Sequence, residues 1–510
     1  MVGESRSNTP RSRQIFGGKV MEQIDKSTYP DDRRIEMTAY IGPRRAGKHV
    51  YNDKYGMYPL DPKEGYPSFI TDEVFELYKD AGLNFLMPEE DAFYKERITK
   101  EGFVEEPDFE KSDLYTYMKM AEKHGLTVYP AIREVFSHIA REKGEFGEDE
   151  KSILKDFVET IQAYFPDTFR GIMLTDEPEY FALPRIKKIM SYLRSDEIKK
   201  IKPNMDIFTS MLPIYGTMKS FHSDYSDDKY KRLRYDEVRK NAYKYYMEQC
   251  SDAVGEFSFD YYALIYENQL TPGFYLNMEM AAEHCKKEGY PFAITLQSFR
   301  MDVNYNEKTG RSLQVYRTPH YEDMRWQVYS ALAFGVQRIG YYTFWSHYGL
   351  RSHTVQQNAM VVFDPSDEKG YRTTEIYDAV KKVNHEILAF DHVFLRFKWL
   401  GCRVVRTSRD RNIRLVQGGY KGGSLVSETA TRDLLIGCME NPEDGKEGYW
   451  IVNAENPFRN QINDVEIVFK DATSVTYYRK GKAYDMTLDG GKFSIRLGVG
   501  EGIFVLPHQS

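Results

Sequence analysis

Short apolar runs alternate with amphipathic helical segments along most of the chain, and this alternation constrains the fold more than any other feature. Apolar runs without polar–apolar alternation are typical of strands buried on both faces. Strands that alternate with helices indicate parallel βαβ units, and eight such units indicate a closed (β/α)8 barrel, a TIM barrel in the α/β class. The predicted strands are Met37–Ile41, Asn84–Met87, Leu126–Ala131, Gly171–Leu174, Met205–Met211, Glu256–Phe259, Phe292–Leu296 and Arg338–Thr343.

The pattern changes near residue 393, where short runs of alternating polarity replace the strand–helix units. Turn signals such as Asp489-Gly490-Gly491 separate these runs, which is typical of antiparallel strands. The chain has 510 residues, too many for one compact core. We therefore expect a loose N-terminal lead-in over residues 1–34, a catalytic barrel over 35–392 and a small antiparallel β-sandwich over 393–510.

Composition and motifs exclude several classes of function. The formal net charge is −7 without a concentrated basic patch, which argues against a nucleic-acid partner. No apolar run reaches membrane-spanning length, and the N-terminus has no apolar signal-peptide core, so we expect a cytoplasmic protein. The four cysteines and eleven histidines form no ligand pattern, and phosphate-binding, dinucleotide and serine-hydrolase motifs are absent from the sequence. We expect neither a metal nor a cofactor.

Aromatic residues are unusually frequent at 15% of the chain, with 40 Tyr and 30 Phe. Sugar faces stack on aromatic rings, and tyrosine hydroxyls bond to sugar hydroxyls. The composition is therefore compatible with carbohydrate binding, although a general compositional bias would explain it equally well.

The stretch Phe169–Tyr180, FRGIMLTDEPEY, contains the strongest candidate for chemistry. Its apolar run breaks into Asp176 and Glu177, and Pro178 ends the strand because proline cannot continue a central ladder. Two carboxylates at the carboxyl end of the fourth strand lie where such barrels carry their catalytic groups. Glu177 is the predicted general acid, because burial and the Asp176 charge would both raise its pKa. The alternative is that Asp-Glu-Pro only caps the following helix.

Asp260 emerges from the apolar sixth strand and precedes Tyr261 and Tyr262. Glycoside cleavage needs a carboxylic acid and a second carboxylate, and the ends of strands four and six can face each other across the barrel mouth. Asp260 is thus a candidate second carboxylate, unless it only orders the Tyr-Tyr turn.

Other residues at the strand ends are candidate substrate contacts. Gln297 follows strand seven and could hold a sugar hydroxyl or an acetamide, or it could be a satisfied loop amide. Trp345 follows strand eight and is the predicted stacking platform, with a core tryptophan as the alternative. The remaining predicted substrate contacts, several of which could instead be salt-bridged rim residues, are Tyr40, Glu90, Glu134, Tyr215, Tyr262, Arg300 and His347.

Four segments resemble glycoside hydrolases of the (β/α)8 type with a trailing β-sandwich, over roughly residues 35–507. They are similar to poorly characterised bacterial glycosidase-like proteins loosely related to clan A, which includes β-galactosidases with a barrel and accessory β-domains. The segments are GIMLTDEP (171–178), FSFDYY (257–262), RWQVYSALAFG (325–335) and YYTFW (341–345).

The resemblance implies an acid/base Glu after strand four, which Glu177 matches, and a nucleophile Glu after strand seven, where this chain has Gln297. Two arrangements could replace the missing glutamate. Asp260 could supply the second carboxylate, since another glycosidase clan uses carboxylates after strands four and six. Alternatively, Asp176 could orient a substrate acetamide, as in the N-acetyl-β-galactosaminidases that Asp-Glu-Pro resembles.

The sequence thus predicts a glycoside hydrolase that acts, by exo cleavage, on short imported oligosaccharides. Glycosidases of this size often form homo-oligomers through accessory domains, so self-association is one arrangement that the resemblance allows. A non-catalytic sugar-binding barrel is the main rival, because the expected nucleophile position holds an amide. A structural scaffold would instead show a plugged mouth and a large exposed apolar patch.

Overall fold

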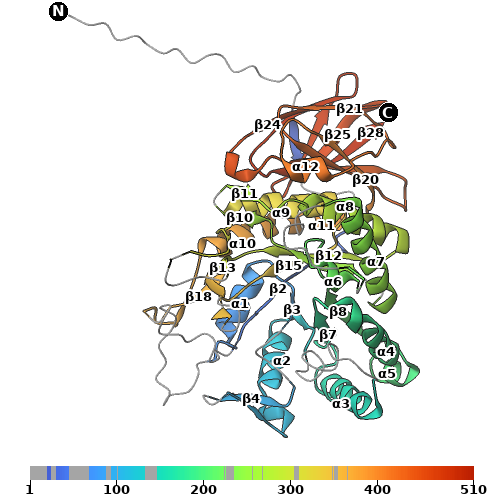
Figure 1. Ribbon diagram of the computed structural model, residues 1–510. Helices are drawn as coiled ribbons and strands as arrows, with labels where there is room; N and C mark the ends of the chain where they lie inside the picture. Colours follow the sequence, from blue (N-terminus) through green and yellow to red (C-terminus); the bar gives the residue numbers. More distant parts are fainter. Residues whose placement is uncertain are drawn as a thin grey trace, which may run out of the picture.

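The computed structural model of the chain describes residues 20–24, 30–44, 68–87, 94–99, 102–131, 146–222, 224–225, 235–254, 257–266, 268–303, 309, 311–346, 348–349, 354–364 and 366–509. Figure 1 shows a strand–helix barrel in blue, green and yellow, with an antiparallel β-domain in orange and red stacked against one side of it.

Eight parallel strands close into a barrel in chain order, as the alternation predicts. Register-matched parallel pairs and three isolated parallel bridges, Tyr40 to Met87, Val128 to Phe169 and Met211 to Phe259, link each strand to the next. The last strand pairs with the first through Ile339 and Met37, so the barrel is closed. The strands are β2 (Glu36–Ala39), β3 (Phe85–Leu86), β6 (Thr127–Val128), β7 (Gly171–Asp176), β8 (Asp206–Ser210), β9 (Phe257–Tyr261), β12 (Phe292–Gln297) and β15 (Arg338–Tyr342).

Among the described residues, eight main helices alternate with the strands, as the strand–helix pattern predicts. Local signals set their ends: the Ser112 hydroxyl caps α2 by accepting from Tyr115 N at 3.1 Å, and Gly289 ends α8 at φ 73°. No helix among the described residues is long and apolar enough to cross a membrane. The main helices are α1 (Asp72–Asp80), α2 (Asp113–Lys123), α3 (Glu148–Tyr164), α4 (Leu183–Leu193), α7 (Glu237–Val254), α8 (Phe274–Glu288), α9 (Tyr321–Ala333) and α10 (Glu375–Leu388).

Loops at the carboxyl ends of strands β9, β12 and β15 form a six-stranded antiparallel sheet, called here the wall sheet. Its strands come from three different loops, so β10 pairs with β14 and β13 pairs with β17. The sequence gives no signal for this sheet, because its strands are only two to five residues long. In spatial order its strands are β11 (Gln269–Leu270), β10 (Leu264–Ile265), β14 (Gln314–Tyr316), β13 (Arg300–Val303), β17 (Thr354–Asn358) and β16 (Tyr348–Gly349).

The C-terminal domain is a β-sandwich, as predicted. A seven-stranded sheet packs on a three-stranded sheet, and Ile451 and Val505 of the first meet Ile467 and Phe493 of the second in a shared apolar core. The larger sheet contains β1 (Val20–Ile24), β26 (Lys482–Thr487), β25 (Ala472–Arg479), β28 (Gly502–Gln509), β23 (Glu447–Asn453), β22 (Leu434–Glu440) and β20 (Lys398–Val405); the smaller contains β21 (Leu425–Ala430), β24 (Asn463–Phe469) and β27 (Lys492–Leu497).

Strand β1 differs from the expected loose lead-in over residues 1–34. It pairs antiparallel with β26 at one edge of the larger sheet, with Val20 opposite Met486. The surrounding segment is rich in Arg and Ser, so its composition gives no strand signal. The partner strand supplies the pairing from more than 450 positions away in the sequence, as the register shows.

The barrel and the sandwich share buried polar contacts. Arg325 of α9 pairs with the buried Glu501 at 2.9 Å. Glu279 of α8 accepts hydrogen bonds from the backbone of Gln417 and Gly418 at 2.7 and 2.9 Å. Gly437 in β22 lies so close to α9 that a Cβ there would sit 2.0 Å from the Ala333 carbonyl. The sandwich is therefore fitted closely onto the barrel helices.

Charged side chains fill the amino-terminal end of the barrel. Arg338, the first residue of β15, pairs with Glu36 at 2.5 Å and with Asp206 at 3.1 Å. Its guanidinium also lies 5.6 Å from the Tyr129 ring. Burial alone would raise the pKa of Asp206, but the charge of Arg338 and the Tyr129 hydroxyl outweigh it and the pKa is lowered. We call this group, with Arg170, the barrel floor.

We expect Arg338→Met to destabilise the protein by about 1–3 kcal/mol, because it removes one of the two guanidinium groups that pair with Glu36 and Asp206 and leaves only that of Arg170. Differential scanning calorimetry measures the effect as a lower melting temperature. The control is Arg33→Met, which breaks an exposed pair with Glu443 and should cost less than about 1 kcal/mol. Equal losses in both variants would show that the barrel floor does not stabilise the fold.

Candidate active site

Three carboxyl groups converge at the carboxyl-terminal end of the barrel. Asp176 ends β7, Glu177 follows it, and Asp260 lies near the end of β9. Only β8 separates these two strands, so their ends are close in space. Asp260 is in hydrogen-bonding contact with Glu177 and experiences the charge of Asp176. The barrel thus brings together the three residues that the sequence singles out.

Asp260 titrates near neutrality. Its side chain is buried, with the residue 7% exposed, and this loss of solvation is the main reason that its pKa rises to about 7. The negative charge of Asp176 raises the pKa further, whereas polar contacts from Glu177, the backbone and Tyr262 act in the opposite direction. A carboxyl group with this pKa can both hold and release a proton at physiological pH.

Glu177 is exposed at the barrel mouth and has an unusual backbone conformation. Its φ is 45°, in the left-handed region that non-glycine residues rarely adopt. Tertiary contacts hold it there: its N–H donates to the Ser210 carbonyl at 2.8 Å, and the next carbonyl, of Pro178, accepts from the Tyr246 hydroxyl at 2.6 Å. Such strain persists only where the surroundings impose it, and it is common at functional sites.

Tyrosines surround the carboxyl groups. The Tyr342 ring lies 5.6 Å from the Tyr262 ring and 6.1 Å from the Tyr40 ring. Burial, and then the charge of Asp260, raise the pKa values of Tyr215 and Tyr262, so both hydroxyls stay protonated. Tyr215, Tyr262 and Tyr342 are partly exposed. They offer hydroxyl groups and ring faces beside the acids, as carbohydrate recognition requires.

Trp345 is not the stacking platform that the sequence suggests. Its indole is fully buried and packs on Phe363 at 4.5 Å and on Phe69 at 5.2 Å. The prediction was wrong because the chain has already left the barrel mouth at this residue. Tyr342, which the sequence analysis overlooked, lies beside Tyr262 instead. Strand alternation carries the signal: Tyr341 faces helix α10, where it bonds to Asn384, so Tyr342 faces the interior.

Gln297 does not face the mouth either. The side chain is fully buried, and its amide bonds to three backbone carbonyls and one backbone N–H of neighbouring loops. It therefore fits the satisfied loop amide, and its predicted role as a sugar contact is wrong.

The other predicted contacts differ in their outcome. Arg300 starts β13 of the wall sheet, is partly exposed and lies 3.7 Å from Asp302. Tyr40 is buried and packs toward Tyr342. Glu90, Glu134 and His347 lie outside the described residues. Tyr316, which the sequence analysis did not select, comes from β14 and packs 5.9 Å from Tyr262.

Within the described ranges, no group of three or more His, Cys, Asp or Glu residues has the geometry to hold a metal ion.

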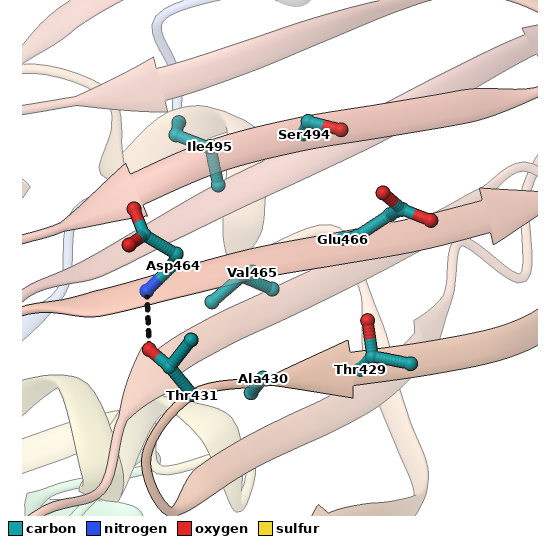
Figure 2. Close-up of a pocket in the computed structure, with 8 residues that line it drawn as sticks. All are labelled: Thr429, Ala430, Thr431, Asp464, Val465, Glu466, Ser494 and Ile495. Atoms are coloured by element: carbon teal, nitrogen blue, oxygen red, sulfur yellow. Dashed lines mark hydrogen bonds between the residues drawn. The ribbon is translucent and has the colours of Figure 1, made fainter. Parts of the chain in front are cut away.

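A hollow of about 250 Å³ lies on the outer face of the smaller sandwich sheet (Figure 2). Asp464 and Glu466 point from β24 into it, but Arg496 and Lys492 pair with them at 2.6 and 2.5 Å. None of the eight residues in Figure 2 is aromatic, so the hollow lacks the features of the barrel mouth.

No protein-family model matches the sequence, and no curated protein matches it. Among solved structures, the chain is similar to a family 39 glycoside hydrolase from Bacteroides cellulosilyticus WH2, with 10% identity, a TM-score of 0.44 and coverage of 96% of this chain and 83% of that one. It is also similar to an Anoxybacillus α-amylase, with 10% identity, a TM-score of 0.47 and coverage of 94% and 98%. At these values the similarity says nothing about substrate or catalytic residues.

We expect Asp260→Asn to stabilise the protein more at pH 8 than at pH 5. The native carboxyl, with a pKa of about 7, binds its proton more tightly than the unfolded chain does, so wild-type stability falls as pH rises from about 4 to about 7. The variant does not lose this stability as the pH rises. The loss in wild type is at most about 4 kcal/mol, because each unit by which the pKa is raised corresponds to about 1.4 kcal/mol. Melting temperatures measured from pH 4 to 9 test this, with exposed Asp378→Asn as control. A pH-independent difference between Asp260→Asn and wild type would contradict the assignment.

Proposed function

We propose that the protein is a glycoside hydrolase whose catalytic groups are Glu177, Asp260 and Asp176. The observation that carries this proposal is the contact between exposed Glu177 and buried Asp260, whose pKa is about 7. Cleavage of a glycosidic bond needs one protonated carboxyl and one carboxylate at the same site. Carboxyl groups in hydrogen-bonding contact, one of them with a pKa near 7, supply that combination at neutral pH.

In this proposal Glu177 and Asp260 share one proton in the free enzyme. Glu177 is open to the mouth, so it delivers the proton to the departing glycosidic oxygen. Asp260 then acts as the second carboxylate, either as nucleophile at the anomeric carbon or as base for water. In the alternative, Asp176 orients a substrate acetamide, whose oxygen is the nucleophile. The partly exposed tyrosines hold the sugar. The wall sheet covers the side of the mouth beyond strands β9, β12 and β15, which supports exo action on short oligosaccharides.

One observation favours a non-catalytic sugar-binding barrel. Carboxyl groups in hydrogen-bonding contact are closer than the roughly 5–5.5 Å of retaining and the 6.5–9.5 Å of inverting pairs. For catalysis the substrate must therefore move Glu177 away from Asp260 when it binds. A binding protein would keep the tyrosines and never open the pair.

We expect wild-type protein to release the aglycone from at least one member of a panel of aryl glycosides and aryl acetamido-glycosides. Glu177→Gln and Asp260→Asn should each lower kcat by about 10²–10⁴-fold, the usual contribution of a general acid or base. Glu179→Gln is the matched control, because this exposed glutamate lies two residues away and bonds to Ser220.

The pattern of the panel separates the alternatives. Cleavage of acetamido sugars alone, with loss in Asp176→Asn but not in Asp260→Asn, would identify Asp176 as the second carboxylate. Sugar binding by calorimetry without turnover, on the panel and on natural oligosaccharides, would refute the hydrolase and support the binding protein.

We further expect kcat/KM to fall about tenfold per pH unit above about pH 7, because the shared proton is then lost from the free enzyme. Measurements of kcat/KM for wild type with its best panel substrate from pH 5 to 9 test this decrease. A profile that stays flat up to pH 9 would mean that the proton on Asp260 is not used in the reaction.

A further inference from the structure

The side-chain amide of Gln297 forms hydrogen bonds with the backbone of two loops at the barrel mouth. It ends β12, and its Oε1 accepts from Leu264 N at 2.9 Å. Its Nε2 lies 3.0 Å from the Arg317 carbonyl and 3.3 Å from the carbonyls of Leu264 and Phe299. One amide therefore joins the loop after β9 to both ends of the loop after β12.

The backbone of Gln297 is itself held by a residue of a barrel helix. The side chain of Gln327, on α9, accepts from Gln297 N and donates to Gln297 O, both at 3.1 Å. Arg317 is fixed as well, because its guanidinium bonds to both oxygens of Asp323 at 2.6 and 2.5 Å. Asp323 also accepts from His320 N at 2.9 Å, at the start of α9. Gln297 and Arg317 are thus both tied to α9.

The joined backbone carries Tyr262, which interacts with Asp260, and two aromatic residues that pack on Tyr262. Tyr262 precedes Leu264 by two residues, and Tyr316 immediately precedes Arg317. The Phe299 ring lies 5.0 Å from the Tyr262 ring and 5.4 Å from the Tyr316 ring. Tyr262 in turn contacts the Asp260 carboxyl. The position of Tyr262 therefore depends on the loops that Gln297 holds.

We infer that Gln297 is a positioning residue: its amide holds the loops that place Tyr262 against Asp260 and that pack Phe299 and Tyr316 on Tyr262. The role requires an amide and excludes a carboxylate. A glutamate could accept from Leu264 N, but it could not donate to three carbonyls, and its charge would be buried without a partner. In this chain the end of strand seven is committed to holding the mouth together, so a catalytic glutamate has no place there. The inference adds to the proposed function, but its first test needs no sugar.

The first test follows the ionisation of Asp260 through stability. Asp260→Asn is introduced into four parent proteins. In each case the melting temperature of the Asp260→Asn protein minus that of its parent grows with pH and reaches a plateau near the pKa of Asp260. The parents are wild type, Gln297→Met, Gln327→Met and Tyr262→Phe. Loss of the Tyr262 contact, which lowers the pKa of Asp260, should move the plateau to higher pH in all three variants.

Several outcomes of this test would overturn the inference. A Gln297→Met parent that melts lower but keeps the wild-type plateau would show a structural role alone. An additive shift in the Gln297→Met/Tyr262→Phe double variant would show that Gln297 does not act through Tyr262. If Gln297→Met fails to fold, Gln327→Met, which loosens Gln297 without replacing it, must still move the plateau.

The second test replaces the amide by the acid that the resemblance implies for this position. Gln297→Glu should lose hydrolysis at least tenfold on any glycoside that wild type cleaves, and the matched control Gln461→Glu, on the sandwich, should not. Increased hydrolysis in Gln297→Glu would identify the position as a nucleophile site and overturn the inference. If wild type cleaves nothing, the proposed function fails, whereas the plateau measurements still decide the role of Gln297.

Discussion

Closure of the barrel is the constraint on which the site depends. Pairing of β2 with β15 joins two segments about 300 positions apart, and the floor carboxylates of Glu36 and Asp206 meet the guanidinium of Arg338 only in the closed form. Closure places the ends of β7 and β9 one strand apart, and the site carboxyls then meet without any loop to guide them. The floor and the mouth are therefore opposite ends of one barrel, with guanidinium groups beside the carboxylates at the floor and three carboxyl groups close together at the mouth.

The contrast between these two ends is a division between stability and function. At the floor, cations lower the pKa of Asp206 despite its burial. At the mouth, Asp260 is buried beside like charge, and its pKa rises. Glu177 adds backbone strain at φ 45°. The protein thus tolerates an unfavourable arrangement where chemistry is proposed, and the well-paired remainder of the barrel compensates for it.

Sequence reasoning succeeds where the signal is local. Apolar runs and helix periodicity locate the eight barrel strands and main helices, and the position of acids after strands four and six predicts their meeting. Sequence reasoning fails where a segment becomes a strand only through pairing with a distant part of the chain. The wall sheet consists of strands of two to five residues whose partners come from other loops, so no period marks them. Trp345 and Gln297 look like mouth residues by strand count, but whether they face the mouth or the core depends on loop paths that the sequence does not reveal.

The pairing of β1 with β26 makes the sandwich a discontinuous domain. One of its edge strands is synthesised before the barrel, and the rest follow after it, so the barrel is inserted between parts of the same sheet. The outer edge of β26 stays uncovered until both ends of the chain are brought together, and uncovered edges invite pairing with other chains. Strand β1 therefore moves the edge of the larger sheet from β26 to a strand from the opposite end of the chain: a chain shortened past Ile24 keeps every barrel residue, but its larger sheet ends at β26.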